Sequence, residues 1–126
     1  MKLFLLASAG GALGAGARYL VYQHVTRLWG AAFPWATLLI NISGSLLIGV
    51  FVAILLERLP DTTALRVFLI TGILGGFTTF SAFSFEVVEL IERAELLYAL
   101  LYVTGSVVLS VAACWIGLVI TRALLP

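Results

Sequence analysis

The stretch of sequence that decides the fold is Thr71-Gly72-Ile73-Leu74-Gly75-Gly76-Phe77-Thr78-Thr79-Phe80-Ser81-Ala82-Phe83-Ser84-Phe85. It lies inside an apolar run long enough to enter a bilayer, but three glycines within five residues and two adjacent threonines weaken helix formation there. Irregular backbone at membrane depth is tolerated only where it is buried in protein or faces a water-filled cavity. We therefore predict a transmembrane span that is broken near residues 75–79, with an ion site at the break.

The composition of the whole chain is that of an integral membrane protein. Of its 126 residues, 63% are hydrophobic and 10% are charged, whereas a soluble domain has roughly 25% charged residues. Because a transmembrane helix needs about 20 apolar residues, four spans use most of the chain and leave no room for a soluble catalytic or nucleic-acid-binding domain. The formal net charge of +1 favours no polyanionic partner, and a single cysteine, Cys114, excludes an intrachain disulfide.

We predict an all-α membrane protein with a single four-helix transmembrane domain over residues 1–126. The spans are expected at about 2–28, 34–56, 64–92 and 95–122. The first nine residues also resemble a cleavable signal peptide. A membrane span is the better interpretation, because the apolar core before Ala9 is only about five residues, against about 7–15 in signal peptides, and the hydrophobic run continues to Tyr22.

The first span combines small residues with a buried cation. Gly10 and Gly14 form a GxxxG pair, at which a second helix can approach closely. A charged side chain within a span is costly and usually faces a partner or water. Two interpretations of Arg18 therefore remain open, snorkelling to the interface and a functional role.

The second span carries a polar stripe. Thr37, Asn41 and Ser45 are spaced by four residues and so share one helix face. An unsatisfied amide in hydrocarbon costs several kcal/mol, which means that Asn41 must face a protein group or water. It either holds two helices together or lines a path for an ion.

The third span offers groups for ions of both signs. A break frees backbone carbonyls from helical hydrogen bonds, and those near Gly75 and Thr78 suit a hard cation, which prefers oxygen ligands. Beyond the break, Phe80 and Phe83 share a face with Glu86, and the positive edges of aromatic rings attract anions. Ordinary apolar packing is the alternative, although hydroxyl groups beside the two rings favour an anion path.

The fourth span has three hydroxyl groups on one face, those of Tyr102, Ser106 and Ser110, again spaced by four residues. They could form a track for a dehydrated anion or could bond back to their own helix.

The distribution of basic residues gives only a weak preference for one orientation in the membrane. One side has four basic residues, and the other has two, or three if Arg18 snorkels there. We therefore expect insertion in both orientations and an antiparallel homodimer about a two-fold axis in the membrane plane. Four helices are also few for enclosing a pathway.

Three motifs together resemble the Fluc (CrcB) family of small fluoride channels over essentially the whole chain. They are Gly10-Gly11-Ala12-Leu13-Gly14-Ala15-Gly16-Ala17-Arg18-Tyr19, Asn41-Ile42-Ser43-Gly44-Ser45 and Gly75-Gly76-Phe77-Thr78-Thr79-Phe80-Ser81-Ala82-Phe83. The third string is highly specific in a four-span protein of this length, whereas the glycine motif alone is not. Small departures are Ala36, where glycine is expected, and Ile73-Leu74 near the break.

The resemblance implies a passive, fluoride-selective channel that exports cytoplasmic fluoride across the bacterial plasma membrane, built as an antiparallel homodimer with two pores. It implies anion-facing rings at Phe80 and Phe83, a pore-lining donor at Asn41 and a carboxylate near the mouth at Glu86. The polar track would be extended by Thr37, Ser81, Tyr102, Ser106 and Ser110. The carbonyls of Gly75 and Thr78 from both subunits would hold one structural sodium ion, and Arg18 matches a family arginine.

Other classes fit the sequence less well. A small dual-topology, proton-coupled exporter of cations or drugs needs an acidic residue deep in the bundle, but the first, second and fourth spans have none in their interiors and Glu86 lies towards an end. In a non-transporting assembly subunit the polar stripes would only hold helices together. No nucleophile–base pair or metal-ligand cluster indicates an enzyme. The expected partners are fluoride, membrane lipid and a second copy, without nucleic acid.

Overall fold

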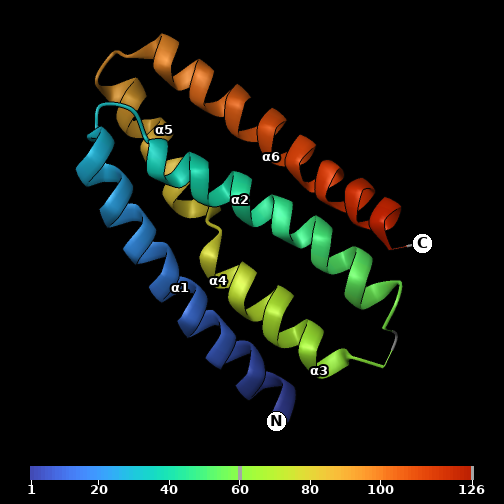
Figure 1. Cartoon of the computed structure of the whole chain (residues 1–126). Coiled ribbons are helices and arrows are strands. Elements are labelled where there is room, and N and C mark those ends of the chain that lie inside the picture. Colours follow the sequence, from blue (N-terminus) through green and yellow to red (C-terminus); the bar gives the residue numbers. More distant parts are fainter. Residues whose placement is uncertain (60, 126) are drawn as a thin grey trace.

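The apolar runs of the sequence form helices that pass back and forth along one common direction (Figure 1). The structure is a computed structural model that describes residues 1–59 and 61–125. Within these residues it contains no β-strand, and four helical segments are long and apolar enough to cross a membrane. They are α1 (Lys2–Trp29), α2 (Trp35–Phe51) with a π-helical continuation (Val52–Leu56), a third segment (Thr63–Glu92), and α6 (Leu96–Leu124). The predicted all-α architecture with four spans is confirmed.

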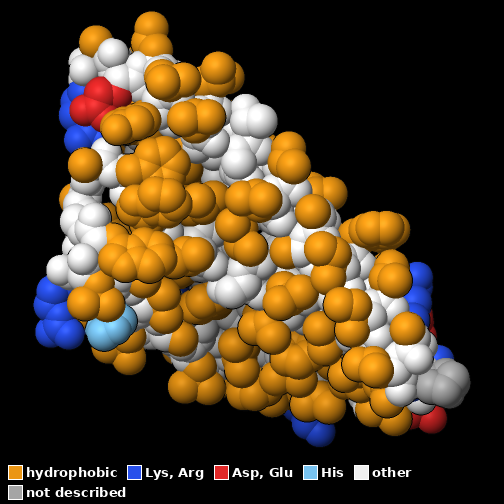
Figure 2. Space-filling view, turned by 45° about the horizontal axis from the view of Figure 1, so that its top comes forward, with side chains coloured by type: hydrophobic (Ala, Val, Ile, Leu, Met, Phe, Trp, Pro, Cys, Tyr) orange, Lys and Arg blue, Asp and Glu red, His pale blue; other side chains and the backbone are white. Residues whose placement is uncertain are grey.

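The surface matches a membrane environment. Figure 2 shows hydrophobic side chains over most of the visible face, with charged side chains gathered near its margins. A hydrophobic exterior of this extent is unfavourable in water but is expected where lipid surrounds the protein.

The third segment is composed of four pieces. They are α3 (Thr63–Arg66), a π-helix (Val67–Leu74), α4 (Gly75–Phe77) and α5 (Phe80–Glu92). Between α4 and α5, Thr78 and Thr79 have extended backbone, with φ/ψ of −75°/158° and −153°/123°. Helical backbone geometry therefore stops at Phe77 and resumes at Phe80.

The glycines of this segment have a different role from the one expected. Gly75 and Gly76 remain helical, whereas we expected the glycine-rich stretch to interrupt the helix. Gly72 instead faces α1, where an added Cβ atom would lie 2.8 Å from the Cα atom of Gly10. The missing side chains allow α1 and the third segment to pack backbone to backbone. The extended residues are β-branched threonines, which lose side-chain freedom in a helix and suit an extended backbone.

An ion pair joins α6 to the end of the segment formed by α2 and its π-helical continuation. The Arg122 guanidinium donates from Nε to the Glu57 carboxylate, with an Nε–Oε2 distance of 3.0 Å. This hydrogen bond lowers the pKa of the Glu57 carboxyl from its ordinary value. The two helices are thereby linked where α2 gives way to the connection that leads to α3.

Candidate functional site

A groove with a volume of about 420 Å³ lies beside the extended residues, between α2, the third segment and α6. It brings together seven of the residues predicted for the site. These are Asn41, Gly75, Thr78, Phe80, Phe83, Ser106 and Ser110. Three spans that are distant in sequence therefore contribute to one cavity.

Asn41 holds the extended backbone in place. Its Nδ2 atom donates to the carbonyl oxygen of Thr79 at 2.9 Å, and its Oδ1 atom accepts from the amide nitrogen of the same residue at 2.8 Å. The side chain thus provides both hydrogen bonds that a neighbouring strand would give to an extended residue. An amide nitrogen carries two hydrogens, so the second N–H of Asn41, which also lines the groove, is left for another acceptor.

The two carbonyls predicted to bind a cation have both lost their usual helical donors. The amide of Thr79, four residues after Gly75, donates to Asn41 instead. The amide of Ala82, four residues after Thr78, donates to the hydroxyl of Thr79 at 3.2 Å and so caps α5. Carbonyls freed in this way at a helix end need another partner.

Arg18 reaches one of these carbonyls. Its Nη1 atom lies 3.4 Å from the carbonyl oxygen of Thr78, which is a long and therefore weak hydrogen bond. This contact is directed toward the interruption in the third segment, and the two interpretations of Arg18, snorkelling and a functional role, both stay predictions. The positive guanidinium stabilises the exposed carbonyl end of α4.

The two phenylalanines of the expected ladder are in contact but differ in burial. The ring centroids of Phe80 and Phe83 are 5.4 Å apart, at an interplanar angle of 42°. Phe83 is 9% exposed, whereas Phe80 is 78% exposed. Ser81 does not line the groove, and its hydroxyl lies 3.4 Å from that of Thr79. The ring of Phe80 is therefore on the surface of the protein, at the edge of the groove.

The hydroxyl groups of Ser106 and Ser110 are buried and have no hydrogen-bond partner among the residues that the structure describes. Back-bonding to the helix, the alternative left open by the sequence, is absent at both positions. It does occur at Ser43 and Ser84, whose hydroxyls donate to the carbonyl four residues earlier at 2.7 Å and 2.9 Å. Both serines line the groove, so a ligand that enters beside them could accept hydrogen bonds from hydroxyls that have no partner in the described part of the protein.

The remaining predicted polar residues form a separate buried cluster. Glu86 accepts hydrogen bonds from the Thr37 hydroxyl at 2.8 Å and from the Tyr102 hydroxyl at 2.6 Å. Thr37 and Tyr102 are fully buried. The ring of Phe83 packs against that of Tyr102 with a centroid distance of 5.1 Å, so Phe83 joins this cluster to the groove.

The sequence pattern indicates Thr79 only as one of the hydroxyls beside the two rings and indicates no role for Phe33. Thr79 is buried, is held by Asn41 and caps α5. Threonine just before a helix is a capping signal that the sequence does contain. Phe33 packs against Tyr102 with ring centroids 5.6 Å apart, and its position in a connection gave no periodic pattern that could indicate this contact.

These features define a class of protein: a small multi-pass membrane protein with an uncharged, largely apolar groove that carries hydroxyl and amide side chains beside an interruption in its third span. Comparison with known proteins narrows the class. The profile of the family described as CrcB-like protein, Camphor Resistance (CrcB), matches residues 5–118. The chain belongs to the CrcB family, and the predicted resemblance is confirmed.

Similar proteins cover almost the whole chain. A protein of Rhizobium etli named Fluoride-specific ion channel FluC is 49% identical over 120 residues, which are 95% of this chain and 96% of the relative. Proteins with the same name from Rhizobium meliloti and Nitrobacter winogradskyi are 45% and 51% identical, covering 98% and 96% of this chain and 99% and 97% of the relatives. These matches and the four spans identify the chain as a multi-pass bacterial membrane protein.

Proposed function

We propose that this protein is a passive, fluoride-selective ion channel that lets cytoplasmic fluoride leave the cell. The observation that carries the proposal is the pair of buried, unpartnered hydroxyls at Ser106 and Ser110, two serines that line a groove together with Asn41 and two phenylalanine rings. The names of its relatives, fluoride-specific ion channels, support the same function and indicate no enzyme.

The chemistry of the groove suits a small anion that must lose water. A fluoride ion is strongly hydrated, so several close donors must replace its water molecules. The Ser106 and Ser110 hydroxyls and the second N–H of Asn41 are such donors, and the ring edges of Phe80 and Phe83 add a weaker attraction. Because these groups are neutral, they bind the ion weakly enough for it to move on.

No specific observation favours a proton-coupled exporter. Among the described residues that line the groove none carries a charge, and Glu86 already accepts two hydrogen bonds outside it. A carboxylate that exchanges protons with the transported ion would need to reach the groove.

The test is fluoride efflux from liposomes that contain purified protein, with the membrane potential shunted by an ionophore. We expect rapid fluoride loss and chloride loss close to that of protein-free liposomes. Absent fluoride flux, or chloride flux of comparable rate, would refute the proposal. Liposomes with protein but without the ionophore provide the control, because passive movement of an ion stops when its charge is not compensated.

We further propose that the channel is an antiparallel homodimer of chains inserted in both orientations. The exposed ring of Phe80 beside an open groove supports this, because a second copy would cover the ring and complete the wall of the path. A C-terminal reporter should be detected on both sides of the membrane. Detection on one side only would contradict dual insertion.

We also propose that a structural sodium ion is bound by the carbonyls of Gly75 and Thr78. The loss of the usual helical donor at both carbonyls supports this site, and the long contact from Arg18 to the Thr78 carbonyl would give way to the bound ion. One chain supplies two oxygens, and a second copy would double that number, closer to the higher coordination of hard cations. The dimer should be more heat-stable in sodium than in an equal concentration of N-methylglucamine, and equal stability would contradict the site.

A further inference from the structure

The connection between α1 and α2 presents a single aromatic side chain to the interior. After α1 ends at Gly30, whose φ is 79°, the amide of Trp35 donates to the carbonyl of Phe33 at 2.8 Å. Pro34, between them, has φ/ψ of −79°/59°, which is the geometry of an inverse γ-turn. The proline ring fixes φ, so the backbone at Phe33 is held firmly and its side chain has a defined direction.

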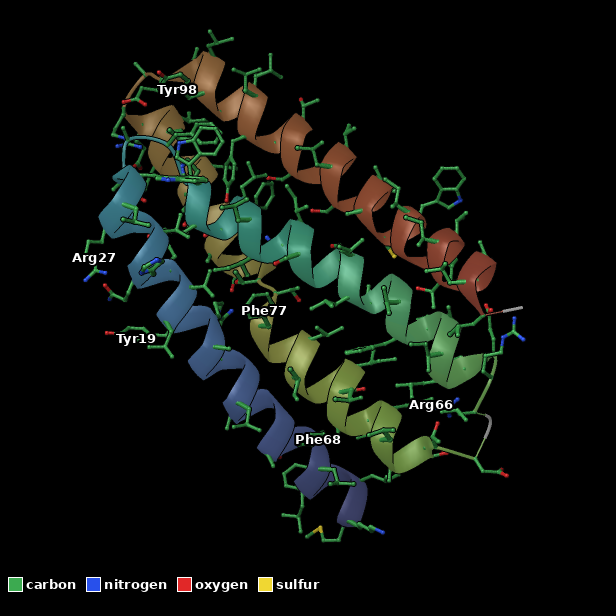
Figure 3. The ribbon with its side chains drawn as sticks, viewed as in Figure 1. Tyr19, Arg27, Arg66, Phe68, Phe77 and Tyr98 are labelled. Carbon is green, nitrogen blue, oxygen red and sulfur yellow. The ribbon has the colours of Figure 1, made fainter. Side chains whose placement is uncertain are left out.

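The Phe33 ring packs edge-on against two tyrosines of α6. Its centroid lies 5.6 Å from that of Tyr102 and 5.8 Å from that of Tyr98, with interplanar angles of 79° and 88°. Figure 3 labels Tyr98 at the end of α6 that lies near this connection. Phe83 packs against Tyr102 as well, at 5.1 Å. Tyr102 therefore contacts one ring from the groove and one from the connection.

These two rings line different cavities. Phe83 lines the groove, whereas Phe33 lines a smaller cavity of about 180 Å³ that also reaches Glu86, Glu89 and Arg93. The buried Tyr102 hydroxyl donates to Glu86. Tyr102 lines neither cavity but packs against one ring from each, which places it at the junction between them, and the orientation of its ring determines where the hydroxyl is.

We propose that Phe33 is a positioning residue for the fluoride path: its ring holds Tyr102 in the orientation that keeps the hydroxyl on Glu86 at this junction. The proposal rests on the proposed function of the protein. Edge-to-face ring pairs have a defined geometry and add stability beyond simple burial, so the contact selects one rotamer of Tyr102. Without the Phe33 ring, Tyr102 gains free space and its hydroxyl leaves Glu86, so the carboxylate loses one of the two hydrogen bonds that fix it beside the fluoride path.

A double-mutant cycle in fluoride efflux tests this role. Phe33→Ala should lower the fluoride rate by about ten-fold, and Phe33→Leu, which keeps apolar volume without a ring, should lower it less. Tyr102→Phe removes the hydroxyl, so adding Phe33→Ala to it should cause little further loss. Trp115→Ala is the matched control, because Trp115 is an exposed aromatic residue of α6 that is not among the ring partners of Phe33 or Tyr102. It should keep the wild-type rate.

The outcomes separate this role from general packing and from failure of the proposed function. Wild-type flux in Phe33→Ala, or an equal fold-loss with and without the Tyr102 hydroxyl, would overturn the positioning role. If Phe33→Ala does not elute as a single species in size-exclusion chromatography, the double-mutant cycle is measured with Phe33→Leu and Tyr102→Phe instead. The same two outcomes would then overturn the positioning role. Absence of fluoride flux in the wild-type protein would refute the proposed function, and this role with it.

Discussion

Two neighbouring stretches of one helix face differ in how their hydroxyl groups are used. On α6, the Tyr102 hydroxyl is bound to Glu86, which also accepts from Thr37. One and two turns later, the Ser106 and Ser110 hydroxyls are buried without a partner within the described part of the chain. A buried hydroxyl without a partner costs free energy. The contrast indicates that the hydroxyls around Glu86 are used within the protein, where they hold this carboxylate in place and stabilise the fold, while the serine hydroxyls are kept for a ligand.

The largest effect is expected from a negative charge in the groove. Asn41→Asp should reduce fluoride flux to the background rate, because a carboxylate repels the anion and cannot donate to the Thr79 carbonyl. Since a hydrogen bond to the extended backbone is also lost, the free energy of unfolding should fall by about 1–3 kcal/mol. Efflux and denaturant titration measure the two effects. Normal conduction by a folded variant would place Asn41 outside the path.

A smaller but still large effect is expected at the exposed ring beside the groove. Phe80→Ile should lower fluoride flux by about ten-fold or more, because the ring edge is lost while apolar volume is largely kept. Phe85→Ile is the control, since Phe85 is also exposed, at 64%, on the same helix but does not line the groove. Size-exclusion chromatography should show both variants unchanged. Equal flux in the two variants would remove the role of the Phe80 ring.

The contrast between bound and unpartnered hydroxyls can be tested directly by removing one of each kind: the hydroxyl of Ser110, which has no partner within the described residues, and the hydroxyl of Thr37, which is bound to Glu86. Ser110→Ala should lower fluoride flux several-fold without lowering stability, because its hydroxyl has no protein partner to lose. Thr37→Val should lower the free energy of unfolding by about 1–3 kcal/mol, because a hydrogen bond to a carboxylate is removed. Denaturant titration of both variants is the measurement. Similar destabilisation in Ser110→Ala and Thr37→Val would mean that the serine hydroxyl also stabilises the fold and is not kept for a ligand.

The smallest effect on flux is expected where α1 packs against the third segment, because this contact lies away from the hydroxyls bound to Glu86 and from the unpartnered hydroxyls of Ser106 and Ser110. A Cβ atom at Gly14 would overlap the Ile73 carbonyl, so Gly14→Ala should destabilise the protein by about 1–3 kcal/mol. A Cβ atom at Gly16 would meet no other atom within 4 Å. Gly16→Ala should therefore raise the free energy of unfolding by up to about 1 kcal/mol, because alanine has a higher helix propensity than glycine. A thermal unfolding scan compares them. Destabilisation by Gly16→Ala would show that this face is more closely covered than the structure indicates.

The features that follow from regular helix geometry could be predicted from the sequence. Apolar runs gave the four spans, and four-residue spacing placed Tyr102, Ser106 and Ser110 on one face of α6. Their different bonding could not be predicted, because it depends on Glu86 being brought to Tyr102 and to no serine. Such a contact joins two helices and leaves no signal in the local pattern.

The interruption of the third segment at Thr78 and Thr79 also depends on contacts between helices that the local sequence pattern does not reveal. Low helix propensity indicated its approximate position, but Gly75 and Gly76 stayed helical. At Gly76 the backbone of α1 packs closely, a tertiary effect that overrides local preference. The clamp between Asn41 and Thr79 joins residues 38 positions apart. From the sequence, Asn41 could be recognised as needing a partner, but not which one.

The central claim, passive and selective movement of fluoride, is tested most directly by the reversal potential of the current through protein in a planar bilayer. With unequal fluoride on the two sides and equal pH, we predict reversal at the fluoride equilibrium potential. A superimposed pH gradient or a chloride gradient should leave that value unchanged. A reversal potential that follows the proton gradient would indicate coupled transport, and one that follows chloride would contradict selectivity.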